Sequence, residues 1–337
     1  MNLQRHFNLQ AYNTFGINAF CDYFIEITTV SELLEIIHDE GLKSLPTLIL
    51  GGGSNLLFTQ DFKGLVIKNS IKGIDLLKEN EKHVWLKSYS GEVWHDLVQY
   101  AITNNYGGIE NLSLIPGQVG AAPMQNIGAY GIEIESVFDS LEAIDLQNGS
   151  TKIFHKETCQ FGYRESIFKK EAKGKYYVVS VTFKLHKNPV FNTSYGAIQD
   201  TLQQMNAEPS LKNISEAVVQ IRTSKLPDPK VLGNAGSFFK NPEILQEQFI
   251  ELQHQHLNIP HYPAANNKIK VPAGWLIEQC GWKGKRVGNT GSHAQQALVL
   301  VNYGNATGEE IKILSQKIQQ SVKEKFGIEL IPEVNFI

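Results

Sequence analysis

The sequence predicts an α+β protein divided into two or three lobes. Its 337 residues exceed what one hydrophobic core usually serves, so more than one core is expected. Alternating aromatic and β-branched residues, as in 22–27 and 176–183, are typical of strands. Apolar residues three and four positions apart, as in 311–326, are typical of helices. Both patterns recur along the chain, which favours a mixed fold.

Composition and charge describe an ordinary globular protein. Hydrophobic residues make up 42% of the chain and charged residues 19%. The net charge is -3 and the basic residues are spread along the sequence, so there is no electrostatic footprint for nucleic acid or for an anionic membrane. Any phosphate binding is therefore expected to be local.

The cysteines and the lack of long apolar runs indicate in which cellular compartment the protein is expected. Cys21, Cys159 and Cys280 are odd in number and far apart, and no Cys-x-x-Cys pair occurs. This argues for reduced thiols and against a disulfide framework or a zinc site. No run approaches the roughly 18 apolar residues that span a bilayer, and the first six residues lack the apolar region of a signal peptide. We expect a cytoplasmic protein.

The N-terminal third places a glycine-rich loop after a strand. Ser31 is the expected cap of a helix over 32–38, which stops at Gly41. The apolar segment 47–50 then predicts a fully buried strand. Glycines after such a strand leave backbone N–H groups free to face an anion, which makes phosphate binding a hypothesis. The loop consists of Gly51, Gly52, Gly53, Ser54 and Asn55.

This loop matches neither common nucleotide-binding motif. The dinucleotide fingerprint would need a third glycine where Leu56 stands and a following helix, which 59–61 does not resemble. A Walker A loop would need a Lys-Ser or Lys-Thr pair that is absent. The alternative is a tight turn between strands, because glycine turns are common for conformational reasons alone.

A second loop of unusual composition covers 114–131. It follows strands predicted at 64–68 and 83–89 and a helix over 92–104, whose buried side is expected to include Val93. Four glycines, two prolines and three alanines prevent a long regular element, yet the loop is not polar enough to be mobile. We expect it to lie against a flat or pyrophosphate-like ligand, or against another backbone.

Arg164 lies between two predicted strands, 140–145 and 176–183. An arginine that follows a tyrosine in such a loop is usually a solvated cation or a surface pair partner. The polar segment 189–210, which carries Tyr195, has the character of a lid or an insertion. A helix over 214–223 then leads to Lys225 and the next motif.

The segment 226–242 joins prolines and small residues to three polar groups. Ser237, Lys240 and Asn241 supply a hydroxyl, a cation and an amide within five positions. The phenylalanines at 238 and 239 are expected to pin the turn to a core and so to hold the Ser237 hydroxyl in place. Polar side chains on a backbone that is held in place are typical of a catalytic or binding site.

The C-terminal part predicts three helices and two strands. Asn241 before Pro242 is typical of a helix start, and capping alone could account for Asn241. Another helix follows over 271–280. Thr307 and Glu310 form a capping box for a long helix that ends at Gly327. The expected strands are 296–302 and 329–337.

Several short motifs, spread over the chain, carry a family resemblance. They are Asn13-Thr-Phe, Gly51-x-Gly-Ser-Asn55, Ile115-Pro-Gly-x-Val-Gly120, Pro123-x-Gln-Asn-Ile-Gly-Ala-Tyr-Gly131, Phe161-Gly-Tyr-Arg164, Lys225-Leu-Pro-Asp-Pro229, Gly236-Ser-Phe-Phe-Lys-Asn-Pro242, Gly274-Trp-Leu-Ile277 and Pro332-Glu-Val334. Together they closely resemble the UDP-N-acetylenolpyruvoylglucosamine reductases of bacterial peptidoglycan synthesis. The match covers nearly the whole chain in the right order. The segment around Tyr195 resembles the extra loop of the longer, type I branch.

The resemblance implies an FAD-binding fold of the vanillyl-alcohol-oxidase (PCMH-like) type, with two lobes and a smaller α/β substrate-binding domain. Covalent flavoproteins of this type often attach the cofactor through a histidine in the first loop. Ser54 and Asn55 stand there, so non-covalent FAD is expected. The expected division is 1–72 with the strand 328–337 as the first lobe, 73–188 as the second, 189–218 as the Tyr-bearing insertion and connecting helix, and 219–327 as the substrate-binding domain.

The implied substrate is an enol ether conjugated to a carboxylate, UDP-N-acetylglucosamine enolpyruvate. Hydride addition to the terminal carbon develops an enolate, and the middle carbon must then be protonated. Such a site needs a cation near the carboxylate and an acid near one carbon. NADPH is the implied hydride donor. Since only one nucleotide-cradling system is visible, we expect NADPH to leave before the UDP-sugar binds, a ping-pong order.

The resemblance also implies residue roles. Arg164 would stabilise the enolate and Ser237 would donate the proton. Glu333 would pair with Arg164 or with the substrate carboxylate, although a glutamate near a C-terminus is more often exposed. Substrate contacts are expected from Tyr163, Tyr195, Lys225, Asn241 and Lys283, the last of which would otherwise be called a surface lysine. Contacts to FAD are expected from Gly51, Gly52, Gly53, Ser54, Asn55, Leu56, Ile115, Pro116, Gly117, Gly120, Ala121, Pro123, Asn126, Gly128, Tyr130 and Gly236.

Three rival functions remain at this point. An oxidase of the same flavin fold would share the glycine loops but would not need the motif 236–242. A serine hydrolase using Ser237 would need a Gly-x-Ser-x-Gly elbow, which is absent. A nucleotide-sugar binding module would carry no flavin. We expect no obligatory protein partner.

Overall fold

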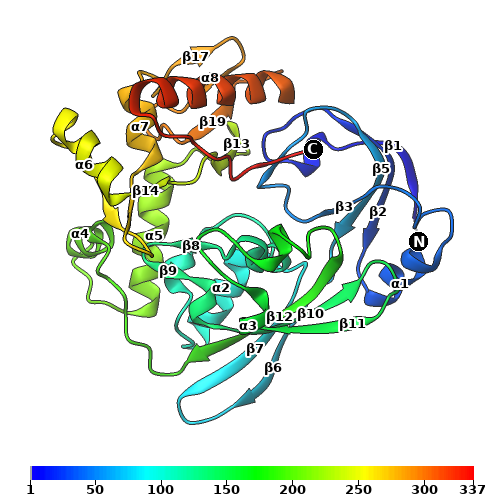
Figure 1. The fold of residues 1–337 in the computed structure, drawn as a ribbon. Helices are drawn as coiled ribbons and strands as arrows, with labels where there is room; N and C mark the ends of the chain where they lie inside the picture. Colours follow the sequence, from blue (N-terminus) through cyan, green and yellow to red (C-terminus); the bar gives the residue numbers. More distant parts are fainter. Residues whose placement is uncertain (1) are drawn as a thin grey trace. The chain divides into compact units, whose positions relative to one another are not determined.

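The computed structural model describes residues 2–337, which divide into two units. The first unit contains residues 2–7, Cys21–Gly52 and Lys63–Ser224. The second contains Asn8–Phe20, Gly53–Phe62 and Lys225–Ile337. Figure 1 follows the chain from blue to red. The four-part division expected from the family resemblance stays a prediction.

A four-stranded sheet in the order β1-β2-β5-β3 positions the first glycine loop. Strand β3 pairs in parallel with β5, from Thr47 opposite Leu65 to Leu50 opposite Lys68. The expectation of a fully buried β3 is wrong, because β3 is an edge strand and only Leu50 is buried. The bounds are β1 Gln4–Asn8, β2 Phe20–Ile27, β3 Thr47–Leu50 and β5 Phe62–Asn69.

Helix α1 (Val30–His38) packs Leu33, Ile36 and Ile37 into the core beside this sheet. Its cap is Thr29 rather than the expected Ser31, because Thr29 and Glu32 form a reciprocal capping box. The helix therefore begins two residues earlier than predicted.

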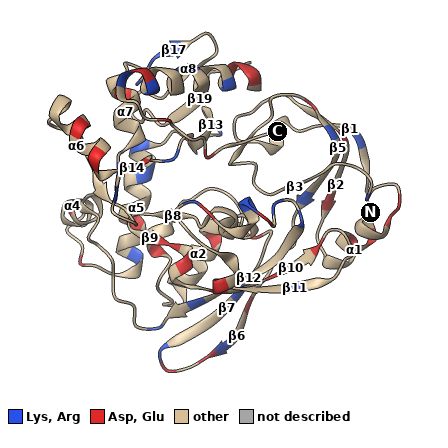
Figure 2. Cartoon of the chain, in the orientation of Figure 1, with Lys and Arg blue, Asp and Glu red and all other residues tan. Residues whose placement is uncertain are grey.

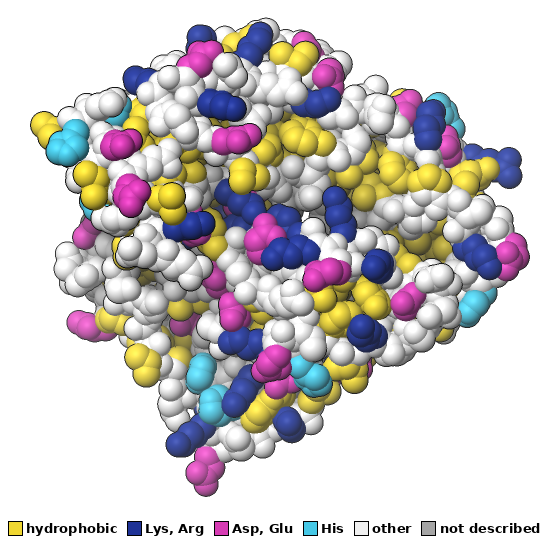
Figure 3. Space-filling model, viewed as in Figure 1, with side chains coloured by type: hydrophobic (Ala, Val, Ile, Leu, Met, Phe, Trp, Pro, Cys, Tyr) yellow, Lys and Arg dark blue, Asp and Glu magenta, His cyan; other side chains and the backbone are white. Residues whose placement is uncertain are grey.

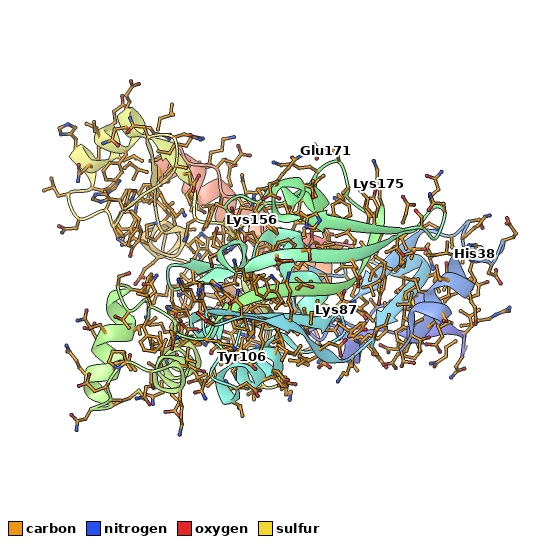
Figure 4. All side chains as sticks on the ribbon, turned by 90° about the horizontal axis from the view of Figure 1, so that it is seen from below. His38, Lys87, Tyr106, Lys156, Glu171 and Lys175 are labelled. Atoms are coloured by element: carbon orange, nitrogen blue, oxygen red, sulfur yellow. The ribbon has the colours of Figure 1, made fainter. Side chains whose placement is uncertain are left out.

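The first unit also contains a five-stranded antiparallel sheet in the order β11-β10-β12-β7-β6, seen from below in Figure 4. Helix α2 (Trp94–Thr103) packs Trp94 and Leu97 into the same core as Leu86 of β7. Val93 was expected to be buried, but it is the exposed N-cap residue. The strands are β6 Ile74–Glu79, β7 His83–Tyr89, β10 Phe138–Asp145, β11 Thr151–His155 and β12 Tyr176–His186.

The segment predicted as a lid or insertion contains helix α4 (Gly196–Gln204), which packs against α5 (Leu211–Lys225) through a small apolar core. Helix α5 contains the predicted helix 214–223 and ends at Lys225, which confirms that part of the prediction. Short elements complete the unit: β8 Gly128–Ala129, β9 Ile132–Glu133, α3 Lys156–Cys159 and the 3-10 helices Glu110–Leu112, Val119–Gln125, Ile134–Ser136 and Ile167–Lys169.

The second unit is built on a sheet in the order β13-β19-β18-β17. Helix α8 (Gly308–Phe326) has the predicted capping box of Thr307 and Glu310 and ends at Gly327 in a left-handed conformation. Both charge signs occur on it in Figure 2. The other elements are η1 Gln10–Tyr12, β4 Leu56–Leu57, β13 Gly233–Ser237, β14 Glu243–Leu245, α6 Gln246–Gln255, β15 Tyr262–Pro263, β16 Lys268–Lys270, α7 Ala273–Gln279, β17 Arg286–Val287, β18 Thr290–Ser292, β19 Val299–Asn302 and β20 Asn335–Phe336.

The helix expected to begin at Pro242 does not form. Residues Glu243–Leu245 pair with Lys268–Lys270 as strands, so α6 starts only at Gln246. Asn241 instead contacts the N-terminus of another helix, α7. Its side-chain oxygen accepts a hydrogen bond of 2.9 Å from the backbone N–H of Ala273, the first residue of α7. Long-range strand pairing thus overrides the local proline signal.

The predicted terminal strand 329–337 forms only in small part. Only Asn335–Phe336 form a strand, β20, which pairs in parallel with Leu56–Leu57. Side chains of both charge signs are interspersed over the face shown in Figure 3, in keeping with the scattered charges of the sequence. Along residues 2–337, no helix has both the length and the apolar character needed to cross a bilayer.

Candidate active site

The two glycine-rich loops meet backbone to backbone within the first unit. A Cβ atom on Gly52 would lie 3.2 Å from the Cα of Gly117, and one on Gly51 would lie 2.9 Å from Oε1 of Gln118. The expectation that the second loop lies against another backbone is therefore confirmed for these residues. Glycine suits both positions because a Cβ atom at either one would crowd the facing loop.

Gly53 is fixed by a turn in the second unit. Its φ of +64° lies in the left-handed region, and a Cβ atom there would come within 2.0 Å of the carbonyl oxygen of Tyr12. Its own carbonyl oxygen accepts from the N–H of Thr14 at 3.1 Å. No helix follows, since the next elements are strands β4 and β5, which agrees with the exclusion of a dinucleotide fingerprint.

Asn55 joins this loop to the C-terminal segment. Its amide nitrogen donates to the Glu333 carbonyl oxygen at 3.3 Å. Its carbonyl oxygen accepts from both the backbone and the side chain of Asn335. Ser54 is half-buried and Leu56 is buried. The expected cofactor residue Asn55 thus also anchors β20.

The second loop is a compact turn rather than a flexible segment. Val119–Gln125 form a 3-10 helix that includes the buried Pro123. Gly120 packs on Ser90, where a Cβ atom would lie 2.5 Å from the serine Cβ. Pro116 and Ala121 are exposed, while Ile115 is half-buried. The loop therefore has a buried side and a side that can receive a ligand.

Asn126 organises the end of this loop. It is fully buried with a φ of +45°, and its amide donates to Glu133 at 2.9 Å and to the Gly162 carbonyl at 3.2 Å. Its side-chain oxygen accepts from the N–H of Glu135 at 3.1 Å. Each of these bonds is internal, so the Asn126 side chain has a structural role whether or not its backbone contacts a cofactor.

Arg164 is not a solvated surface cation. Its side chain is 19% exposed, and its Nη2 donates to the carbonyl oxygen of Gly128. Its Nη1 lies 3.7 Å from Oε1 of Glu133, and the guanidinium lies 5.3 Å from the ring centre of Tyr163. Glu133 was missed by sequence reasoning, because an acidic residue after Gly-Ile gives no local signal of this contact.

Tyr195 belongs to an aromatic and cationic group. Its ring meets that of Tyr130 edge to face at 5.3 Å, and Tyr195 is 43% exposed. Burial lowers the pKa of Arg222, which is hydrogen-bonded to Tyr130. Burial likewise raises the pKa of the Tyr130 phenol, with Arg222 opposing that effect. The Arg222 Nε is buried with no hydrogen-bond partner within residues 2–337. No local sequence pattern distinguishes this arginine from an ordinary helix residue.

Ser237 sits directly after a β-bulge. Asn234 pairs with Val301 and Ser237 with Val299, so two residues of β13 face one residue of β19. Gly236 has a φ of +68°, and its N–H donates to the Asn234 side chain at 2.9 Å. Ser237 itself is exposed.

The following phenylalanines, at 238 and 239, are 0% and 1% exposed. The expectation that they pin the Ser237 turn to a core is confirmed.

The other candidate residues of the second unit differ in setting. Glu333 is half-buried rather than exposed, and its N–H donates to the Phe238 carbonyl at 2.8 Å. Lys283 is exposed and pairs with Glu278 at 2.9 Å. Lys225 is exposed at the end of α5.

Comparison with known proteins shows the class and the family. Residues 21–154 match the FAD binding domain family, and residues 228–337 match the family described as UDP-N-acetylenolpyruvoylglucosamine reductase, C-terminal domain. The chain is 51% identical to the UDP-N-acetylenolpyruvoylglucosamine reductase of Flavobacterium johnsoniae over 339 residues, with both chains covered completely. It is 52% identical to that of Amoebophilus asiaticus over 338 residues, again with full coverage.

A solved structure extends the likeness to the fold. The crystal structure of the Thermus caldophilus UDP-N-acetylenolpyruvylglucosamine reductase aligns with a TM-score of 0.70 at 23% identity, covering 100% of this chain and 99% of that one. Fold and loops thus define an FAD-dependent oxidoreductase of the vanillyl-alcohol-oxidase-like type, with mixed α+β architecture. Within that class, the chain belongs to the UDP-N-acetylenolpyruvoylglucosamine reductase family.

The residues present fit FAD. Loops 51–56 and 115–125 carry no acidic side chain, so nothing in them repels a diphosphate. Both loops present backbone on glycine, and Oε1 of Gln118 beside Gly51 is a buried acceptor without a partner in residues 2–337. The first loop also has no histidine for covalent attachment, which agrees with non-covalent FAD.

Proposed function

We propose that this chain reduces the enolpyruvyl double bond of UDP-N-acetylglucosamine enolpyruvate to give UDP-N-acetylmuramate, a peptidoglycan precursor. NADPH supplies the hydride and FAD transfers it. The observation that carries the proposal is the full-length identity of about half to relatives named for this reaction. The reaction is proposed to take place in the cytoplasm without an obligatory protein partner.

Ser237 is the proposed proton donor. The carbon that must be protonated carries enolate charge and is a strong base, so a serine hydroxyl can serve as its acid when it is held in place. The bulge at Ala235 and Gly236 and the buried side chains of Phe238 and Phe239 hold the Ser237 backbone. The hydroxyl is exposed and therefore accessible to a ligand.

Arg164 is the proposed cation for the developing enolate. A guanidinium binds a carboxylate through two parallel charge-assisted hydrogen bonds, and it stays charged at any physiological pH. The half-buried setting of Arg164 strengthens such bonds relative to those in bulk water. Glu333 is proposed as the acidic member of the catalytic set.

Substrate contacts are proposed for Tyr163, Tyr195, Lys225, Asn241 and Lys283. The lysines suit a diphosphate, and Lys225 is exposed at the end of a helix, where its charge is available. The FAD diphosphate is proposed to bind the backbone of the two glycine loops.

The proposed domain division is 1–72 with 328–337, then 73–188, 189–218 and 219–327.

An anaerobic experiment tests the function. One equivalent of NADPH should bleach the visible absorbance of the bound flavin, and UDP-N-acetylglucosamine enolpyruvate should restore it with formation of UDP-N-acetylmuramate. A flavin that recovers only when air is admitted would contradict the proposal and indicate an oxidase. Protein purified without flavin would contradict both the proposed reaction and the use of FAD.

The kinetic order is proposed to be ping-pong, with NADPH and the UDP-sugar using the same site in turn. The support is that the sequence offers one pair of glycine-rich loops suited to a nucleotide, 51–55 and 114–131. Excess UDP-sugar should then compete with NADPH. Inhibition that stays non-competitive at every concentration would contradict this order.

A further inference from the structure

Glu133 occupies a defined place beside Arg164. Its Oε1 lies 3.7 Å from Nη1 of Arg164, and its Oε2 accepts a hydrogen bond of 2.9 Å from the amide of Asn126. The buried Asn126 is itself held through Gly162 and Glu135. One oxygen of the carboxylate is therefore anchored, and the other faces the guanidinium.

The short hairpin of β8 and β9 explains this geometry. Gly128 and Glu133 are direct cross-strand partners, and Gly128 also supplies the carbonyl oxygen that accepts from Nη2 of Arg164. A Cβ atom on Gly128 would lie 2.6 Å from Cγ of Glu133 and 3.1 Å from Nη1 of Arg164. Because Gly128 has no side chain, the Arg164 guanidinium can approach this strand pair closely. It then meets a neutral acceptor, the Gly128 carbonyl oxygen, and a charged one, the Glu133 carboxylate.

The orientation of this guanidinium matters for the reaction. Charge-assisted hydrogen bonds from a planar fork are directional, so rotation of the group away from the enolate would weaken them. The Arg164 backbone has a φ of +56°, a region that non-glycine residues rarely adopt. Both side chain and backbone of Arg164 are thus held in a specific conformation by their surroundings.

We propose that Glu133 is a positioning residue for the reductase reaction. It holds the Arg164 guanidinium against the Gly128 carbonyl in the orientation that stabilises the enolate. This inference rests on the proposed function, because the enolate belongs to that reaction. Glu133 acts only through Arg164, and it takes no part in flavin reduction by NADPH.

The test measures the two half-reactions of Glu133→Gln by anaerobic stopped flow. Flavin reduction by NADPH should stay within about twofold of wild type. Flavin reoxidation by UDP-N-acetylglucosamine enolpyruvate should slow by about 10- to 100-fold, since small misplacements of a catalytic group have effects of that order. Flavin content and Tm, measured on the same sample, report whether the fold is intact.

Glu135→Gln is the matched control. Glu135 lies two residues further along, and its carboxylate pairs with Lys156 at 3.6 Å, a residue labelled in Figure 4. The Glu135 side chain is 37% exposed, close to the 35% of Glu133, and its ion pair does not involve Arg164. Both half-reactions should remain as in wild type.

A double-mutant cycle separates positioning from a general structural effect. In an Arg164→Ala background, Glu133→Gln should cause no further slowing, because the group it orients is gone. An equal effect of Glu133→Gln in both backgrounds would overturn the proposal. So would an unchanged reoxidation rate in Glu133→Gln when wild type turns over. A wild-type enzyme that the enolpyruvyl substrate cannot reoxidise would instead overturn the proposed function itself.

Discussion

The backbone N–H of Glu333 donates to the carbonyl oxygen of Phe238 at 2.8 Å. An antiparallel bridge between Phe239 and Pro332 continues this pairing. The C-terminal segment is therefore fixed beside the residues that follow Ser237, although about a hundred positions separate them in sequence. Ser237, the proposed acid, and Glu333, the proposed carboxylate, therefore belong to neighbouring segments of one unit.

The first prediction concerns Glu333. Glu333→Gln keeps the size of the side chain and the backbone pairing with Phe238 but removes the charge. If Glu333 belongs to the catalytic set, flavin reoxidation by the enolpyruvyl substrate should slow by about two orders of magnitude, while reduction by NADPH is retained. Glu329→Gln, an exposed change on the same terminal segment, is the control and should be silent. Equal slowing of both half-reactions by Glu333→Gln would exclude the assigned role.

The second prediction compares two glycines with nearly the same backbone conformation. Gly16 and Gly53 have φ values of +67° and +64°, but a Cβ atom on Gly16 meets nothing within 4 Å, whereas one on Gly53 would lie 2.0 Å from the Tyr12 carbonyl oxygen. Gly16→Ala should lower the free energy of unfolding by about 1 kcal/mol, the cost of a left-handed alanine. Gly53→Ala should cost clearly more and release flavin. Equal Tm and equal flavin content in the two variants would contradict the role of Gly53 in the loop.

The third prediction is a pH dependence at the start of α8. Hydrogen bonds from the backbone and side chain of Thr307 lower the pKa of Glu310 below its usual 4.5. Because the pKa is lower in the folded state, the stabilisation is present above the unfolded pKa and is lost as the pH falls through the folded value.

The Tm difference between wild type and Glu310→Gln should therefore be largest near pH 7 and shrink below pH 4. Glu309→Gln is the control, because the neighbouring Glu309 does not take part in the capping box. A Tm difference that grows on acidification would show that the carboxylate is not the stabilising form.

The fourth prediction concerns thiol reactivity. Burial raises the pKa of Cys21 to about 11 and that of Cys159 to about 12. Because the thiolate is the reactive form, neither thiol should react with iodoacetamide at pH 8 in the native protein, while both should react after denaturation. Rapid native labelling at Cys159, read by mass spectrometry, would contradict its buried setting.

Local signals predicted some parts of this fold well. The caps and the buried face of α8 lie within one stretch of sequence, so Thr307, Glu310 and Gly327 sufficed to set its bounds. Strand β3 was placed correctly at 47–50, but its burial was not, because position in a sheet depends on which strands pair with it. Pro242 failed as a helix signal for the same reason.

In the candidate site, too, residues with a local sequence signal were predicted and residues defined by long-range contacts were not. Ser237 was found because Gly236 before it and two phenylalanines after it give a local pattern with a physical meaning. Glu133 and Arg222 were not found, since their significance lies in contacts with Arg164 and Tyr130 that no spacing reveals. The family resemblance supplied roles for Lys225 and Lys283, which by themselves are exposed lysines.

The two half-reactions of Ser237→Ala test the proposed reaction most directly. The variant should bind FAD and be reduced by NADPH at the wild-type rate, because Ser237 takes no part in that step. Reoxidation by UDP-N-acetylglucosamine enolpyruvate should slow by about 10²- to 10⁴-fold, the scale of losing a positioned acid. Reoxidation at the wild-type rate, or equal slowing of both half-reactions, would contradict the role of Ser237 as the proton donor.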